Sequence, residues 1–193
     1  DKTMLTELAL PMVDCAQLQT LQMATFIDTA KVFSFMYQKG FPHSSVVVKN
    51  TTDWSTNSIV KGTLLAKVTI PKNFQPNTNF SEAKFTVGSS ADKKTVTECT
   101  ADMTDTNGGY KGTQVTINGI QFTKFNMGDA GAGNYYETTS YHTVRDAKCY
   151  VVEYTIHSTS IGAYDPSQGI EEFDKAKVTK VLEDIVASFK FTS

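Results

Sequence analysis

Apolar and polar residues alternate most regularly between residues 112 and 158, and this alternation predicts a run of β-strands. Within it, Asn118-Gly119 separates two extended stretches and is typical of either a tight type I′ hairpin or a bulge within one long strand. A glycine-rich turn at 128–134 and a turn at 145–147 separate the later strands. The predicted strands cover residues 115–117, 120–125, 135–142 and 149–157. A three-stranded antiparallel meander is the expected arrangement.

Successive side chains of a strand point to opposite sides, so the strand at 149–157 has two faces of different chemistry. One face consists of Tyr150, Val152, Tyr154 and Ile156. The other face consists of Cys149, Val151, Glu153, Thr155 and His157. A carboxylate and an imidazole are therefore expected on the same side of the sheet as a cysteine.

The C-terminal residues follow a helical period. The apolar stripe consists of Val178, Val181, Leu182, Ile185, Val186 and Phe189, with Lys180, Glu183 and Asp184 opposite. Glu171 and Glu172 are expected in the first turn, where their charge suits the helix dipole. The pattern predicts an amphipathic helix packed on the sheet. Because strands come first and a helix closes the chain, the predicted fold class is α+β with an antiparallel sheet.

The N-terminal half predicts further strands and a different beginning. Strands are expected at residues 31–38, 45–49, 60–70 and 82–88. Apolar residues near the start are spaced close to a helical repeat, at Met12, Ala16, Met23, Phe26, Ile27 and Ala30. We therefore predict an N-terminal arm or helix at residues 1–30 and a single α+β domain at residues 31–193.

Composition limits the classes of partner. The chain has 193 residues, 40% hydrophobic and 11% aromatic, which suffices for one sizeable core. The formal net charge is −2 and Arg145 is the only arginine, so we expect no nucleic acid partner. No apolar run reaches about 18 residues, which predicts no membrane span. The first residues lack the basic-then-apolar order of a signal peptide, so the chain has the look of a mature protein.

Three cysteines form an odd set. We predict a disulfide between Cys99 and Cys149, which would staple a β-rich domain and indicates an oxidising, extracytoplasmic compartment. Cys15 is left over near the start, and we expect it to be a free thiol or to link two chains.

The C-terminal part, under half of the chain, resembles the PsbP-like proteins. The resemblance lies in the order of a strand with Tyr135-Tyr136-Glu137, a short turn, a strand with Tyr150, and a helix that ends in Ser188-Phe189-Lys190-Phe191. PsbP-like proteins are secreted, lumenal or lipid-anchored α/β/α sandwiches. The resemblance implies a central antiparallel sheet with helices on its faces, an extracytoplasmic setting, and a mostly non-enzymatic role in binding or assembling other components.

One set of polar residues is a candidate for chemistry. Glu153 and His157 share a strand face, and Glu137 and Tyr141 share a face of the preceding strand. If the two faces coincide, these four side chains could bind a cation or a small polar ligand, or move a proton. The alternative is a solvated sheet face with cross-strand pairs. No histidine spacing is typical of a zinc site, and we expect no metal and no cofactor.

The leading hypothesis is a secreted or cell-envelope, non-catalytic module that binds or assembles other components, with a protein partner or self-association expected and the ligand unknown. One alternative is a structural subunit of an extracellular filament or surface layer that uses the N-terminal arm for subunit contacts. A second alternative is a small-molecule hydrolase that uses Glu137, Glu153 and His157.

Overall fold

Two antiparallel sheets and one long helix form the described part of the chain, residues 22–45, 47–56, 58–104 and 109–192 of the computed structural model. The main sheet has eight strands in the order β3-β5-β6-β10-β9-β8-β7, with β4 paired to β5. Its strands are β3 (His43–Ser44), β4 (Val48–Thr51), β5 (Gly62–Ile70), β6 (Phe80–Ser90), β7 (Thr113–Ile117), β8 (Ile120–Gly131), β9 (Asn134–Arg145) and β10 (Lys148–Thr159). The small sheet consists of β1 (Met23–Ile27), β2 (Phe33–Gln38) and β11 (Lys190–Phe191). The helices are α1 (Lys93–Glu98) and α2 (Lys175–Ser188), with short 3₁₀ turns η2 (Lys72–Phe74), η3 (Ile161–Ala163) and η4 (Pro166–Gln168).

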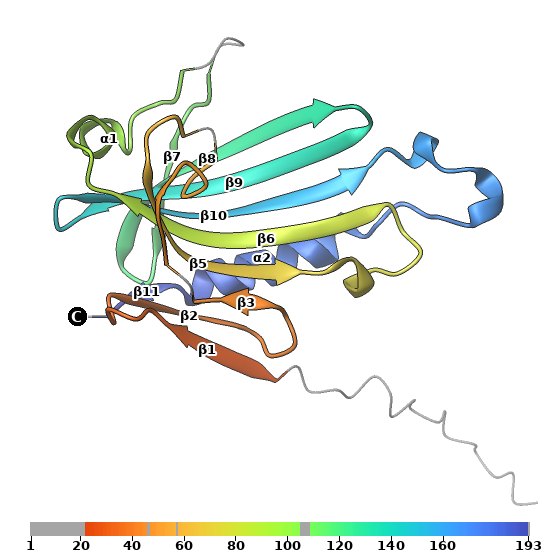
Figure 1. Cartoon of the computed structure of the whole chain (residues 1–193), viewed down its shortest axis with the longest axis horizontal. Coiled ribbons are helices and arrows are strands. Elements are labelled where there is room, and N and C mark those ends of the chain that lie inside the picture. The colour runs from red at the N-terminus through yellow and green to blue at the C-terminus, as the bar shows by residue number, and fades with distance from the viewer. Residues whose placement is uncertain (1–21, 46, 57, 105–108, 193) are drawn as a thin grey trace, which may run out of the picture.

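The main sheet has two faces that meet different parts of the chain. Its inner face packs against α2 and the small sheet, and the segment between β4 and β5 crosses its outer face (Figure 1). Phe35 of β2 meets Phe85 of β6 on the inner face, with ring centroids 4.8 Å apart. The buried side chains that follow the helical period are Val178, Leu182, Ile185, Val186 and Phe189. The predicted amphipathic helix on an antiparallel sheet is confirmed, and the fold class is α+β.

The helix begins later than the sequence suggests. Its first residue is Lys175, so Glu171 and Glu172 precede it and their predicted place in its first turn is wrong. The carboxylate of Asp174 caps the helix by accepting a hydrogen bond from the backbone N–H of Lys177 at 2.9 Å. Just before the cap, the backbone N–H of Phe173 donates a hydrogen bond to Oδ1 of Asn79 at 2.9 Å.

The predicted meander is formed by β8, β9 and β10, which pair in that order. Asn118 and Gly119 both have positive φ, 48° and 76°, the backbone that a type I′ turn requires, and they join β7 to β8. The hairpin alternative therefore holds, and the bulge does not. The glycine-rich loop is shorter than expected, because β8 continues to Gly131 and β9 starts at Asn134.

The predicted N-terminal helix is wrong for the part of it that the structure describes. Met23–Ile27 forms strand β1, which pairs with β2. Phe26 is buried by this pairing and stacks on Phe35 at 4.8 Å, a contact that outweighs the helical spacing of the apolar residues. The predicted boundary at residue 30 therefore divides the small sheet. The earlier residues of the arm, with Cys15, lie outside the described part of the chain.

No helix in the described part of the chain is long and apolar enough to span a bilayer.

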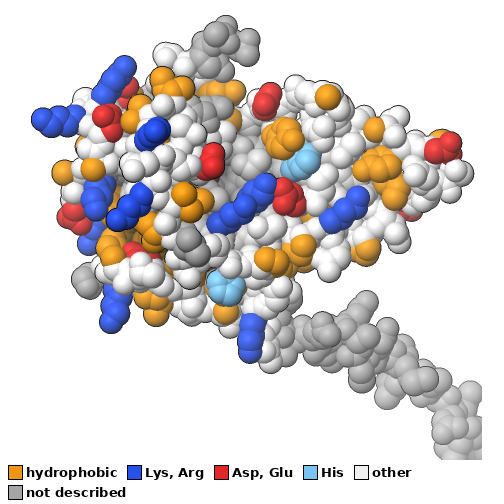
Figure 2. All heavy atoms as spheres, in the orientation of Figure 1, with side chains coloured by type: hydrophobic (Ala, Val, Ile, Leu, Met, Phe, Trp, Pro, Cys, Tyr) orange, Lys and Arg blue, Asp and Glu red, His pale blue; other side chains and the backbone are white. Residues whose placement is uncertain are grey.

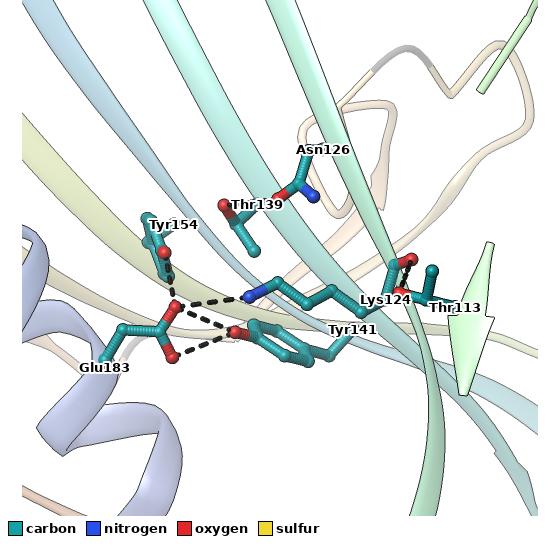
Figure 3. Close-up of polar contacts among 7 residues, drawn as sticks. All are labelled: Thr113, Lys124, Asn126, Thr139, Tyr141, Tyr154 and Glu183. Atoms are coloured by element: carbon teal, nitrogen blue, oxygen red, sulfur yellow. Dashed lines mark hydrogen bonds and ion pairs between the residues drawn. The ribbon is translucent and has the colours of Figure 1, made fainter. Parts of the chain in front are cut away.

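A cluster of hydroxyl and charged groups fastens α2 to the inner face (Figure 3). The carboxylate of Glu183 accepts hydrogen bonds from the phenol of Tyr154 at 2.7 Å and from that of Tyr141 at 3.0 Å. Lys124 lies 3.5 Å from the same carboxylate. Burial, followed by the nearby charge of Glu183, raises the pKa of Tyr141, and burial also raises the pKa of Tyr154. Both phenols therefore remain protonated donors, and they orient the helix on the sheet.

We expect Tyr154→Phe to lower the free energy of unfolding by about 1 kcal/mol, because it removes one hydrogen bond to a charged acceptor that water can partly replace. Unfolding in urea, followed by circular dichroism, measures the change. Tyr135→Phe is the matched control, since Tyr135 is 47% exposed and outside the cluster. Equal stability of Tyr154→Phe and the parent protein would contradict the role given to Glu183.

Candidate functional site

A row of polar side chains crosses the outer face of the main sheet. Lys67 of β5 is opposite Thr86 of β6, Thr86 is opposite Glu153 of β10, and Glu153 is opposite Ser140 of β9. Directly opposed residues of antiparallel strands share a face, so the four side chains lie side by side. Lysine and acidic side chains are visible beside a histidine on this face (Figure 2).

Residues 52–61, which we call the cover segment, lie over part of this row; residue 57 is outside the described part. Trp54 anchors the segment: its side chain is 2% exposed, packs with Cys99, Cys149 and Val151, and donates from its indole N–H to the carbonyl of Val60 at 2.8 Å. Gly88 of β6 lets the backbone approach closely, because a Cβ there would lie 1.9 Å from the Trp54 carbonyl oxygen. Any larger residue at this position would displace the cover.

Between the cover segment and the sheet lies a polar cavity of about 490 Å³. Its hydroxyl-bearing lining residues are Thr52, Ser55, Thr56, Ser58, Thr86 and Thr155. The charged or acidic lining residues are Asp53, Lys67, Lys84 and Glu153. The sheet supplies the lysines and Glu153, and the cover segment supplies Asp53 and four of the hydroxyls. The cavity therefore exists only while the cover is closed on the sheet.

Glu153 is 5% exposed, and both of its carboxyl oxygens are bound. Oε1 accepts hydrogen bonds from the backbone N–H and the hydroxyl of Thr56, each at 2.9 Å. Oε2 lies 3.1 Å from Oγ of Ser140, and the same Oγ lies 2.7 Å from Nε2 of His142. Nδ1 of His142 lies 2.9 Å from the carbonyl oxygen of Cys99. Glu153, Ser140 and His142, which we call the buried network, thus form a continuous hydrogen-bonded chain.

The hydrogen bonds of the buried network require one additional proton. A carbonyl only accepts, so Nδ1 of His142 carries a proton toward Cys99. Ser140 has one hydroxyl proton for two neighbours, and therefore either Glu153 or Nε2 of His142 must donate to it. The network contains either a carboxylic acid with a neutral imidazole, or a carboxylate with an imidazolium.

Burial decides between these two arrangements. It raises the pKa of Glu153 against the opposing effect of the Thr56 and Ser140 hydrogen bonds, and it lowers the pKa of His142 to about 4. The favoured state is a carboxylic acid that donates to Ser140, whose hydroxyl donates to a neutral His142. Every polar group then has a partner and no charge is buried.

A disulfide closes the His142 end of the network. Cys99 and Cys149 are joined as predicted, with their Cα atoms 5.6 Å apart and a sequence separation of 50. A closed loop of that length stabilises the fold by roughly 4 kcal/mol in the chain-entropy model. A second cavity, of about 260 Å³, is lined by both cysteines, His142, Trp54 and Thr56, and the last of these also lines the polar cavity. The buried network therefore runs between two cavities.

The four residues of the predicted polar cluster do not meet. Tyr141 binds Glu183 and Glu137 forms an ion pair with Lys175, both toward α2 on the inner face. His157 is on the outer face, but it stacks on Tyr136 at 4.4 Å and binds Asn134 at 2.8 Å instead of approaching Glu153. His157 lies four positions after Glu153 along β10, a distance of roughly 13 Å.

The strand register explains this result. The turn between β9 and β10 consists of two residues, Asp146 and Ala147, both with positive φ, so Glu153 is opposite Ser140 and His157 is opposite Tyr136. Glu137 and Tyr141 consequently point to the other face. The sequence predicts a turn at 145–147 but does not fix the register of the two strands, so it does not indicate Ser140 or His142. A two-residue turn would have indicated both.

Comparison with known proteins gives little further guidance. No family model and no curated protein matches the sequence. A crystal structure from Bacteroides thetaiotaomicron aligns at 11% identity and a TM-score of 0.40 over 88% of this chain and 48% of that one, so this chain spans about half of its length. The solution structure of cyanobacterial PsbP from Synechocystis aligns at 11% identity and a TM-score of 0.40, over 94% and 99% of the two chains. LpqN of Mycobacterium tuberculosis, involved in cell envelope biogenesis, aligns at 10% identity and a TM-score of 0.32, over 94% and 97%.

The PsbP-like resemblance of the sequence thus reappears in one of these alignments. Likeness at these TM-scores carries no functional argument, and the function has to be argued from the chain's own side chains.

The buried network predicts a specific dependence of stability on pH. Because the pKa of Glu153 is raised in the native state, its contribution to stability is complete below the ordinary glutamate pKa and is lost as pH rises through the raised value. Glu153→Gln should abolish this loss of stability at rising pH, since the glutamine carbonyl can accept from Thr56 while its NH₂ donates to Ser140. Urea unfolding across a pH series measures the effect.

His142 supplies an internal control with the opposite sign. The pKa of His142 is lowered to about 4, so its contribution to stability is present above the ordinary histidine pKa. This contribution is lost as pH falls through the lowered value. This acid loss should persist in Glu153→Gln. Glu82→Gln, which changes a half-buried carboxylate paired with Lys84, should leave the loss of stability at rising pH unchanged. An unaltered loss at rising pH in Glu153→Gln would show that Glu153 is ionised.

Proposed function

We propose that this protein is an extracytoplasmic binding module that holds a small, oxygen-rich anion in the polar cavity beneath the cover segment and does not transform it chemically. The observation that supports the proposal most directly is the cavity itself, whose volume of about 490 Å³ suits a small ligand. Hydroxyl groups predominate on its walls, and hydroxyls can donate to, or accept from, the oxygens of a sugar acid or a hydroxycarboxylate.

The charges around the cavity favour an anion. Lys84 is partly neutralised by Glu82, which lies 2.5 Å away. Lys67 has no ion-pair partner among the described residues, and Asp53 is the one carboxylate of the described lining besides Glu153. With Glu153 protonated and Lys84 paired with Glu82, Lys67 is the lysine of the described lining whose charge no ion pair offsets. A ligand carboxylate near Lys67 would form an ion pair with it and neutralise its charge.

The absence of turnover is part of the proposal and is supported by geometry. Ser140 stands between a histidine and a glutamate, an order that invites comparison with a nucleophile, but its side chain is fully buried. A substrate cannot reach its hydroxyl without opening the sheet. The hydrolase alternative needs Glu137 beside Glu153 and His157. Glu137 lies on the inner face of the sheet, whereas Glu153 and His157 lie on the outer face. The buried network therefore supports the floor of the cavity.

The extracytoplasmic setting is supported by the disulfide. Disulfides persist in oxidising compartments and are rare in the cytosol. The Cys99–Cys149 bond packs directly against Trp54, so it supports the same cover segment that closes the cavity. A reducing environment would weaken the proposed ligand site as well as the fold.

We expect Lys67→Met to weaken binding of a sugar acid by about tenfold, because it removes one charge-assisted hydrogen bond. Lys39→Met removes an equal charge from an exposed turn and is the matched control. A panel of glucuronate, gluconate and small hydroxycarboxylates, with the corresponding neutral sugars, is titrated while backbone amide resonances are recorded. Anion-dependent shifts at Thr56 and Thr86 are the expected result. Binding that is absent for every anion, or equal in Lys67→Met and the parent protein, would contradict the proposal.

A further inference from the structure

Three potential metal ligands meet at the base of the second cavity. Cys99 follows helix α1, His142 lies in β9 and Cys149 lies in β10. One ligand atom from each of the three side chains lies within 4.8 Å of the other two, and all three residues are buried. In the oxidised protein the two sulfurs are bonded to each other and only the imidazole could serve as a ligand. In this oxidised state the three residues therefore cannot bind a metal ion together.

We propose that reduction of the Cys99–Cys149 disulfide converts this position into a binding site for a thiophilic divalent metal ion of the Zn²⁺ class, held by two thiolates and the imidazole of His142. The reduction is a thiol–disulfide exchange with a dithiol. The S–S bond breaks, the dithiol becomes a disulfide, and two electrons and two protons pass to the protein sulfurs. Metal binding then displaces the protons from both thiols.

The arrangement fits the metal in ligand type and in spacing. Thiolate and imidazole are the usual ligands of zinc, and their distances from the ion, about 2.3 and 2.0 Å, place neighbouring ligand atoms roughly 3.5 to 3.8 Å apart. One ligand atom of each side chain lies within 4.8 Å of the other two. The two sulfurs are now bonded to each other and must move apart after reduction to reach this spacing. The adjoining cavity of about 260 Å³ leaves room for water as a fourth ligand.

The surroundings also match those of a metal-bound histidine. Such histidines usually bind the ion through one ring nitrogen and hold the other in a hydrogen bond that fixes the ring. Both nitrogens of His142 now have partners, Ser140 on one side and the Cys99 carbonyl on the other. One of these bonds can be exchanged for the metal while the remaining one orients the ring. No local sequence motif indicates the site, because positions 99, 142 and 149 meet only in the folded chain.

Cobalt titration tests the proposal, with Cys15→Ser as the parent so that no other thiol is present. The protein is reduced with a phosphine under nitrogen and titrated with Co²⁺, which substitutes for Zn²⁺ and reports thiolate ligation by its charge-transfer and visible bands. We expect one equivalent of Co²⁺ to bind after reduction and none before. Zn²⁺ should then displace it.

His142→Gln should weaken Co²⁺ binding at least tenfold and alter the visible bands, whereas His157→Gln, on the same sheet face, should change neither. Near-ultraviolet circular dichroism of Trp54, which packs on both cysteines, reports the fold in parallel. If reduction abolishes that signal and metal restores it, metal binding and folding are linked and the site is supported. The proposal would be overturned if the reduced protein stayed folded but showed no thiolate–cobalt bands. It would also be overturned if reduction abolished the circular dichroism signal of Trp54 and metal did not restore it, or if the oxidised protein bound Co²⁺ equally well.

Discussion

The two-residue turn at Asp146-Ala147 is the constraint on which the other features depend. It fixes which residues of β9 and β10 are opposite each other, and a shift by one residue would exchange the two faces of the strand. With the observed register, the phenols of Tyr141 and Tyr154 both reach Glu183 and fasten α2. The same register places Glu153, Ser140 and His142 together on the opposite side. One turn thus separates the face of the sheet that packs on α2 from the face that carries the polar cavity and the sulfur pair.

The outer face combines groups that would be costly to bury one by one. In the buried network the carboxyl of Glu153, the hydroxyl of Ser140 and the imidazole of His142 are joined by hydrogen bonds, and Thr56 of the cover segment donates to the carboxyl. Because the buried network carries no net charge, it can support both the polar cavity and the sulfur pair without a buried unpaired ion. The ligand site and the cysteine site are separate in chemistry, but they share one scaffold.

The long strands of the main sheet and α2 were predictable because each depends on a local period, whereas the single strand predicted at 45–49 is wrong, since β3 ends at Ser44 and β4 begins at Val48. The closing helix follows from the spacing of residues such as Val178 and Leu182, and the hairpin at Asn118-Gly119 from the backbone that these residues favour. The start at Met23–Ile27 was not predictable in this way, because its strand depends on Phe35, a tertiary partner. The network was also missed, since Glu153 and Ser140 become neighbours only when the register is known. The Cys99–Cys149 disulfide was predicted from the number and placement of the cysteines, and the compartment was inferred from the disulfide.

The bond between Thr56 and Glu153 joins residues 97 positions apart, whereas the β9–β10 hairpin closes over two residues. Loop-closure entropy therefore orders their formation: the hairpin can appear early, and the cover segment can dock only after β10 has been laid beside β6. The same order holds in reverse for local opening. Partial unfolding that releases the cover segment would expose Trp54 and the sulfur pair while the central strands remain paired, so that the cysteines become accessible to solvent before the core does.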